Sequence, residues 1–226
     1  LAPALAQAGA TIKIDDEASV SIGGGIRVSF SSTEDGAPSG SDRGNDFEVE
    51  NARLYISGRI NKVFGATFNT EIRRDASGNE DGIRVLDAYL QYEPSPLFNV
   101  WAGRMLPPSD RANLDGPFYL SAWDYPLVSQ YPNFAIGRDN GVTVWGKPLE
   151  GKLTYAIGAF EGHNRCTGCS NDDANLLYAA RVAYAFLDAE PAPAYYTAST
   201  YFGAKDILTL GLAAMYQADG VGSSST

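Results

Sequence analysis

Apolar and polar residues alternate along most of this chain, and turn-forming residues interrupt the alternation at intervals. A period of two residues indicates β-strands whose two faces meet different surroundings. In the stretch 63–73, for example, the even positions are mostly apolar, whereas Asn69, Glu71 and Arg73 occupy odd positions. The pattern predicts nine strands, at residues 19–31, 46–60, 63–73, 83–92, 98–106, 141–148, 152–160, 175–187 and 207–218.

The connections between these strands alternate in length. Those after the second, fourth and sixth strands are short, at residues 61–62, 93–97 and 149–151. Those after the first, third, fifth and seventh are longer and polar, at residues 32–45, 74–82, 107–140 and 161–174. Antiparallel neighbours would gather the short turns at one end and the long loops at the other. This asymmetry is typical of an outer-membrane β-barrel, whereas β-sandwiches mix connection lengths.

One connection, residues 188–206, does not fit the rule, because it is long although it would lie at the short-turn end. Its Pro191-Ala192-Pro193 and Tyr195-Tyr196 suggest an ordered excursion. The expected fold is all-β, an antiparallel transmembrane β-barrel. Single-chain bacterial barrels have even strand numbers, so a count of nine predicts that residues 9–226 are the N-terminal part of one larger barrel.

Residues 1–8 resemble the end of a secretory signal peptide. Ala6-Gln7-Ala8 matches the small-x-small cleavage pattern and would place the mature start at Gly9. The alternative is an alanine-rich linker. A cleaved signal implies export, and together with the strand pattern it predicts a location in the bacterial outer membrane, in contact with its lipid.

Composition narrows the classes of function. The net charge of −10 argues against nucleic acid as a partner, because phosphate binding needs a basic face. Gly23-Gly24-Gly25 lies within a predicted strand and lacks the helix that phosphate cradling requires. The sequence contains no nucleophile–base motif, so neither enzymatic activity nor a cofactor is expected.

Three stretches resemble phosphate-selective porins of the O and P type. Their F-x-x-x-x-A-R-L-x-x-x-G pattern is matched by residues 47–58, FEVENARLYISG. Their next hairpin is resembled by DAYLQY at 87–92 together with VWAGRMLPPS at 100–109. The start of a later strand is resembled by KDILTLG at 205–211. The resemblance implies a sixteen-stranded barrel, usually trimeric, that passes small solutes or inorganic anions and folds its third external loop into the lumen. The third loop here departs from strongly phosphate-selective members, because it lacks a dense run of Arg or Lys.

Several charged residues fall on the polar faces of the predicted strands. A charge facing lipid near mid-bilayer costs ~2–4 kcal/mol, so these residues should face the lumen. There the arginines either attract passing anions or pair with lumenal acids. Arg104 falls on the apolar face, which requires a local bulge or a position at the rim. The predicted pore-lining residues are Arg53, Arg59, Arg73, Arg181, Glu71 and Asp87.

The 34-residue connection 107–140 is too long and too aromatic for an ordinary or disordered loop. We expect it to fold inward and narrow the pore; the alternative is a lid on the barrel mouth or a subunit contact. The charged residues expected near the constriction are Arg111, Asp115, Asp124 and Arg138.

Cys166 and Cys169 form a CxxC pair in the fourth external loop, and export favours a disulfide between them. Haem attachment requires His after the second Cys, where this chain has Ser170. A metal site of His163, Cys166 and Cys169 would need a fourth ligand, which Asp172 or Asp173 could supply; this is the less favoured alternative, and no metal is expected.

These observations together predict a passive porin for small hydrophilic solutes with a preference for anions such as phosphate, assembled as a homotrimer. Two alternatives remain open. One is a structural barrel, either a sheath around an electron-transfer partner or an envelope scaffold. The other is a soluble, exported β-sandwich that binds ligands.

Overall fold

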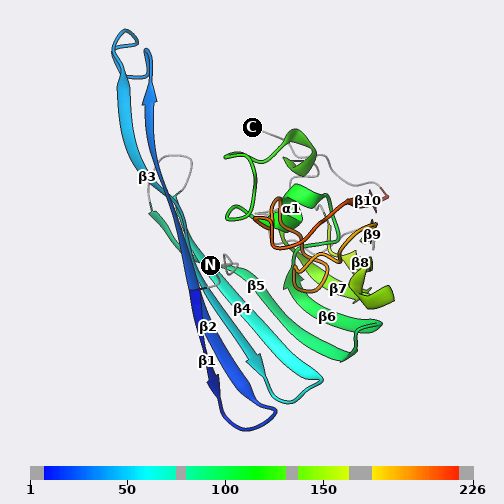
Figure 1. Ribbon diagram of the computed structural model, residues 1–226. Helices are drawn as coiled ribbons and strands as arrows, with labels where there is room; N and C mark the ends of the chain where they lie inside the picture. The colour runs from blue at the N-terminus through cyan, green and yellow to red at the C-terminus, as the bar shows by residue number, and fades with distance from the viewer. Residues whose placement is uncertain (1–7, 75–79, 131–136, 163–174, 219–226) are drawn as a thin grey trace.

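The computed structural model describes residues 8–74, 80–130, 137–162 and 175–218, and within them the chain is almost entirely β (Figure 1). Three short helices interrupt the strands: α1 (Arg111–Asp115), η1 (Leu127–Gln130) and η3 (Leu149–Gly151). The ten strands are β1 (Ala8–Lys13), β2 (Ser19–Thr33), β3 (Gly44–Arg59), β4 (Phe64–Arg74), β5 (Glu80–Ser95), β6 (Phe98–Met105), β7 (Asp139–Gly146), β8 (Leu153–Phe160), β9 (Leu177–Ala185) and β10 (Thr209–Tyr216).

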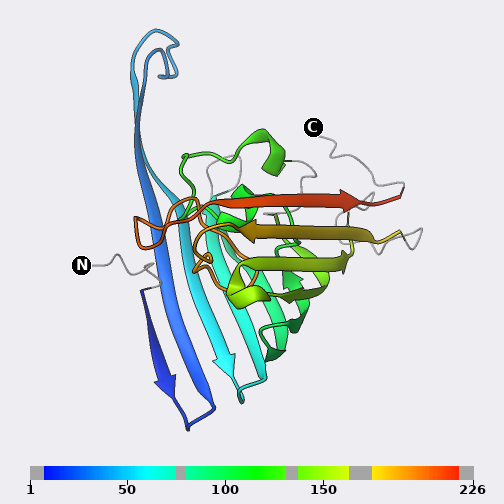
Figure 2. The ribbon, with the colours of Figure 1, turned by 45° about the vertical axis from the view of Figure 1, so that its right-hand side comes forward.

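All ten strands belong to one antiparallel sheet, in which each strand pairs with its neighbours in the sequence. The sheet is open, because β1 and β10 pair on one side only within the described residues. Figures 1 and 2 show that it curves strongly and that α1 and the connection between β9 and β10 lie on its concave side. The all-β antiparallel fold is thereby confirmed.

Each of the nine predicted strands is present, with bounds that differ from the prediction by at most three residues. The described residues contain ten strands, one more than predicted, because β1 precedes the first predicted strand; the strand number therefore no longer indicates a partial barrel. β1 has only six residues, rich in Ala and Gly, and its first residue was assigned to the signal remnant. A short edge strand has too few positions to establish a period of two.

The two faces of the sheet differ as the alternation predicted, but the apolar one is exposed. Ile157, Leu210 and Leu212 are 60%, 71% and 72% exposed on the convex face. Arg53, Glu71 and Thr143 are buried on the concave face. Apolar side chains outside and charges inside are typical of a sheet whose convex face meets lipid.

Four short connections lie at the same end of the sheet, and the longest connection, between β6 and β7, lies at the opposite end, which also carries the short connection 75–79. Residues 14–18, 60–63, 96–97 and 147–152 make the short turns at one end (Figure 1). The connection 186–208 starts from this end too, and it is long, as expected. Among the described residues, no helix combines the length and the apolar character needed to span a membrane.

Arg104 stays on the convex face. It lies opposite Ala88 in β5 and Asn140 in β7, and the irregularity in the β5–β6 pairing lies at the other end, between Tyr92 and Ser95. Arg104 is the penultimate residue of β6, so the structure favours a position at the rim over a bulge.

Candidate functional site

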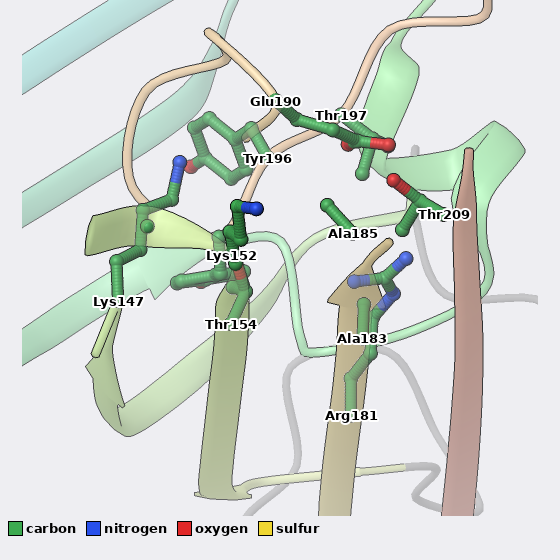
Figure 3. Close-up of a pocket in the computed structure, with 12 residues that line it drawn as sticks. Lys147, Lys152, Thr154, Arg181, Ala183, Ala185, Glu190, Tyr196, Thr197 and Thr209 are labelled. Carbon is green, nitrogen blue, oxygen red and sulfur yellow. The ribbon is translucent and has the colours of Figure 1, made fainter. Parts of the chain in front are cut away.

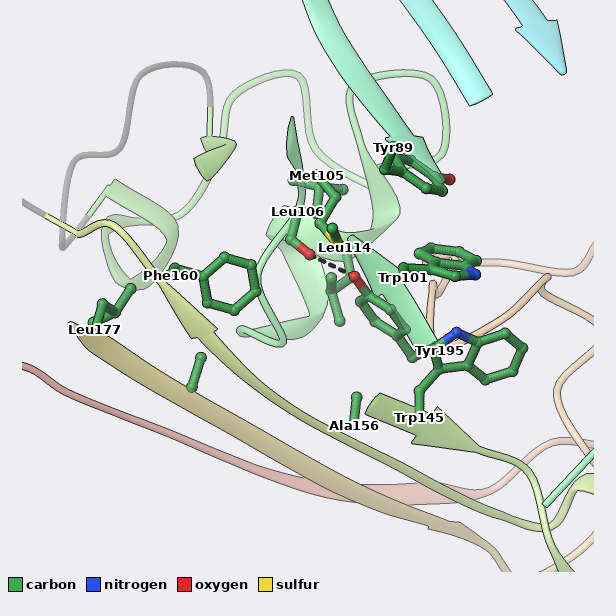
Figure 4. Close-up of a cluster of buried hydrophobic side chains, with 11 residues drawn as sticks. Tyr89, Trp101, Met105, Leu106, Leu114, Trp145, Ala156, Phe160, Leu177 and Tyr195 are labelled. Carbon is green, nitrogen blue, oxygen red and sulfur yellow. Dashed lines mark hydrogen bonds between the residues drawn. The ribbon is translucent and has the colours of Figure 1, made fainter. Parts of the chain in front are cut away.

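The concave face of the sheet is crossed by the connection between β6 and β7, which we call the crossing loop (residues 106–138). It begins in an aromatic cluster on the wall, where Leu114 of α1 is buried beside Trp101 and Phe160 (Figure 4). The Asp110 side chain accepts a hydrogen bond from the Asn113 amide and caps α1. A turn at Gly116, with φ of 67°, then directs the chain away from β6.

The far part of the crossing loop contacts β2 and β3. Phe118 packs over Gly25, where a Cβ atom would lie 3.1 Å from the phenyl ring. The Arg27 guanidinium lies 4.3 Å from the centre of the Trp123 ring and donates hydrogen bonds to the carbonyls of Pro117 and Trp123, at 3.3 and 3.1 Å. The loop is therefore held at two walls of the curved sheet.

The connection between β9 and β10 also enters the concave space, from the short-turn end (Figure 2). We call residues 188–206 the strap. Tyr195 in the strap is 1% exposed, and its ring centre lies 5.3 Å from that of Trp101. Its hydroxyl donates a 2.7 Å hydrogen bond to the carbonyl of Leu106, where the crossing loop starts (Figure 4). The apolar cluster thus joins the strap, the wall and the loop.

Polar contacts join the strap to the crossing loop as well. Arg111 donates to a Glu190 carboxylate oxygen at 2.8 Å and to the Ala198 carbonyl at 2.6 Å. Ser199 donates from its hydroxyl to Asp115 at 2.5 Å. Thr197 donates to the Arg111 carbonyl at 3.0 Å. Two segments from opposite ends of the sheet therefore interlock in its interior.

Most of the wall arginines are ion-paired. Arg53 lies 2.7 Å from Glu71, directly opposite in the β3–β4 register, and Arg138 lies 3.1 Å from Asp87; all four side chains are buried. Arg59 pairs with Glu93. Of the two expectations for these arginines, attracting anions or pairing with acids, the contacts correspond to pairing with acids.

Arg181 differs from the other wall arginines. It is 7% exposed, and it makes no hydrogen bond or ion pair within the described part of the chain. Its guanidinium lies over Gly211 of β10, where a Cβ atom would be 3.0 Å from Nη2. Arg181 is thus a buried cation on the concave face, with Glu190 in the same pocket but no carboxylate within ion-pair distance among the described residues.

The remaining predicted residues divide into two groups. Arg111, Asp115 and Arg138 all lie on the concave side, whereas Asp124 is exposed. The structure does not describe the side chain of Arg73. Residues 1–7 of the expected signal remnant, His163, Cys166 and Cys169 also lie outside the described residues. Sequence reasoning missed Glu190, Thr197 and Ser199; the Pro and Tyr pairs of 188–206 indicated order there but not a partner.

Burial raises the pKa of Asp115 above its ordinary value of 3.8, although hydrogen bonds from Ser199 and Thr197 act in the opposite direction. A carboxyl whose pKa is raised on folding favours the folded state more as the pH falls through the raised value. The interlock should therefore become more stable on mild acidification, because Asp115 then carries a proton.

Replacing Asp115 with Asn tests this effect. The amide keeps an acceptor for Ser199 and carries no charge, so D115N should unfold at a higher temperature than the wild type near pH 7, and the difference should shrink toward pH 4. Asp124→Asn removes the same charge from an exposed site of the same loop and should show no such trend. A constant difference between D115N and wild type across this range would contradict the assignment.

Comparisons with known proteins agree with this geometry. A family model described as phosphate-selective porin O and P matches residues 20–211, which include β2 from its second residue, all of β3 to β9 and the start of β10. No match is found among curated proteins.

Proposed function

Because the chain belongs to the family of phosphate-selective porins O and P, we propose that it is a passive outer-membrane channel for small hydrophilic solutes, narrowed by the crossing loop and the strap. The family is one of outer-membrane channels rather than enzymes. The narrowing, the solute and the charge preference are the proposal.

One observation supports a narrowed channel: the crossing loop spans the concave space from β6 to β2 and is anchored at both sides. Leu114 is buried at one end, and Phe118 and Trp123 contact β2 residues at the other. A lid on the barrel mouth would leave the inner wall uncovered, and a sheath would keep its third loop out of the lumen. Both alternatives are less well supported than a constriction.

We propose that the channel prefers anions only modestly. Arg53, Arg59 and Arg138 are paired with acids, so they add little net field. Among the described residues of the wall, positive charge without an ion-paired acid remains at Arg27 of β2 and at Arg181, which has Lys147 and Lys152 near it. A weak anion preference follows, and a high selectivity for phosphate does not.

Within the described residues, β1 and β10 each have one unpaired edge, and these edges indicate how the barrel is completed. An unpaired strand edge within a bilayer costs several kcal/mol for each unsatisfied backbone group, so both edges need partners. We propose that further strands of the same barrel supply them, to a total of sixteen as in the family resemblance, and that three barrels associate. Heat-modifiable mobility and crosslinking of the full-length protein would test both.

Deleting residues 107–140 tests the constriction in planar-bilayer recordings of the full-length protein. Single-channel conductance should rise, because the segment that crosses the pore is removed. A matched deletion of residues 35–42, in the β2–β3 hairpin tip beyond the crossing loop, should leave conductance unchanged. Equal conductance in wild type and the 107–140 deletion would refute the constriction, and the absence of channels in the wild type would refute the porin.

A further inference from the structure

We propose that a single halide-sized anion is bound between β8, β9, β10 and the strap, with the Arg181 guanidinium as its main ligand (Figure 3). This is a resident ion that holds the strap against the wall. It goes beyond the proposed function, since it does not depend on whether or what the pore conducts.

The first support is that Arg181 makes no close contact with the nearby acids. Glu190 accepts from Arg111 at 2.8 Å and from the Tyr201 hydroxyl at 3.1 Å. Asp115 accepts from Ser199 through one oxygen, and its Oδ1 has no partner among the described residues. Arg181 contacts neither within hydrogen-bonding distance among the described residues. Burying a guanidinium without a hydrogen-bond partner is strongly unfavourable, so an anion at this position would offset a large penalty.

The second support is an unused hydroxyl beside it. Thr209 Oγ1, on the adjacent strand, is buried and has no hydrogen-bond partner among the described residues. Buried hydroxyls are nearly always bonded, and a hydroxyl can donate to an anion as Arg181 does. Gly211, two residues further along β10, leaves the guanidinium the room it occupies. Arg181 and Thr209 line the same pocket from neighbouring strands.

The third support is the charge of the pocket. Three basic side chains line it, Arg181, Lys147 and Lys152, against one acid, Glu190, which leaves a formal charge of +2 (3 − 1). Figure 3 shows Lys152 and Arg181 rising from the sheet toward the strap. Lys147 is tied to the strap, because it donates to the Ala192 carbonyl at 2.5 Å. An anion here would contact cations of the wall directly under the strap.

The size of the pocket limits its occupant. Its volume is about 10 Å³, close to the minimum for one water-sized species. A halide is the anion closest in size to water and needs the least widening of this space, whereas a tetrahedral oxyanion or an organic carboxylate would have to displace the strap. The site therefore predicts chloride as the occupant.

Chloride-dependent stability tests the proposal in the full-length protein. Thermal unfolding would be followed during titration of sodium chloride against sodium gluconate at constant ionic strength. The midpoint should rise and saturate with chloride in the wild type, and the chloride concentration at half effect should increase at least tenfold in Arg181→Gln. Arg59→Gln, a wall arginine paired with Glu93, should keep the wild-type response. An equal chloride response in wild type and R181Q would overturn the proposal.

Bromide substitution gives a readout that does not depend on how the variants fold. Crystals of the wild-type protein grown in bromide should show one anomalous peak in contact with the Arg181 guanidinium and near Thr209. Absence of bromide at Arg181 would overturn the proposal. A peak there that is displaced by equimolar phosphate would also overturn it, because it would identify an open oxyanion site in place of a halide pocket.

Discussion

Replacing Tyr195 with Ala should release the crossing loop and widen the pore. Tyr195 is fully buried between Trp101 and Trp145, and its hydroxyl bonds the carbonyl of Leu106. Removing a buried aromatic side chain costs about 3–5 kcal/mol, since contacts are lost and a cavity remains. Most of this loss should fall on the interlock, because the ring joins the strap to the wall and to the start of the loop.

Hydrogen exchange of the full-length protein would measure the loss, as faster exchange of the amides in residues 109–116 and 194–199. Planar-bilayer recordings should show higher or fluctuating conductance. Tyr195→Phe is the matched control: it removes only the hydroxyl, should cost about 1 kcal/mol, and should keep wild-type conductance. If Y195A conducts as the wild type does and its loop amides exchange no faster, the strap does not position the loop.

Replacing Gly25 with Leu should have the second large effect, at the opposite anchor of the crossing loop. A Cβ atom at this position would already lie 3.1 Å from the Phe118 ring, so a leucine side chain has no room unless Phe118 moves. The loop should leave β2, and single-channel conductance should increase. The barrel itself should remain intact, because Gly25 has ordinary strand geometry and its side chain would point inward.

Two further variants serve as a control and as a rescue for this experiment. Gly58→Leu places the same side chain on the convex face, where the nearest atom to the new Cβ is 3.9 Å away, and should leave conductance unchanged. Phe118→Ala combined with G25L should restore space on the wall and return part of the wild-type contact between loop and β2. A G25L channel indistinguishable from the wild type would mean that the loop does not rest on β2.

The strands were predictable because lipid and lumen impose opposite requirements on adjacent residues. That constraint acts at every position of β2 to β10, so the period of two survives in the sequence. β1 was not predicted because a six-residue edge strand, three of whose residues are Ala or Gly, has too few positions to show the alternation. The family resemblance could be stated from the same stretches, and the match over residues 20–211 confirms it.

The pairing of charges was open at the level of sequence and depends on register. Arg53 and Glu71 meet because they are directly opposite in the β3–β4 pairing, and a slip of one residue would have placed them on opposite faces. Arg138 reaches Asp87 only because the crossing loop returns to the wall at that point. Alternation assigns a face to a charged residue, but it does not assign its partner.

The sequence by itself therefore determined an antiparallel all-β membrane sheet, its apolar and polar faces, and a long aromatic loop, because these are set by local periodicity and spacing. Only the tertiary structure decided what occupies the concave side. The strap and the crossing loop are separated by some fifty residues or more along the chain, and their contacts, such as Tyr195 with Leu106 and Arg111 with Glu190, follow no local pattern. The curvature of the sheet brings them together over Arg181, which has no ion-pair partner in the part of the chain that the structure describes.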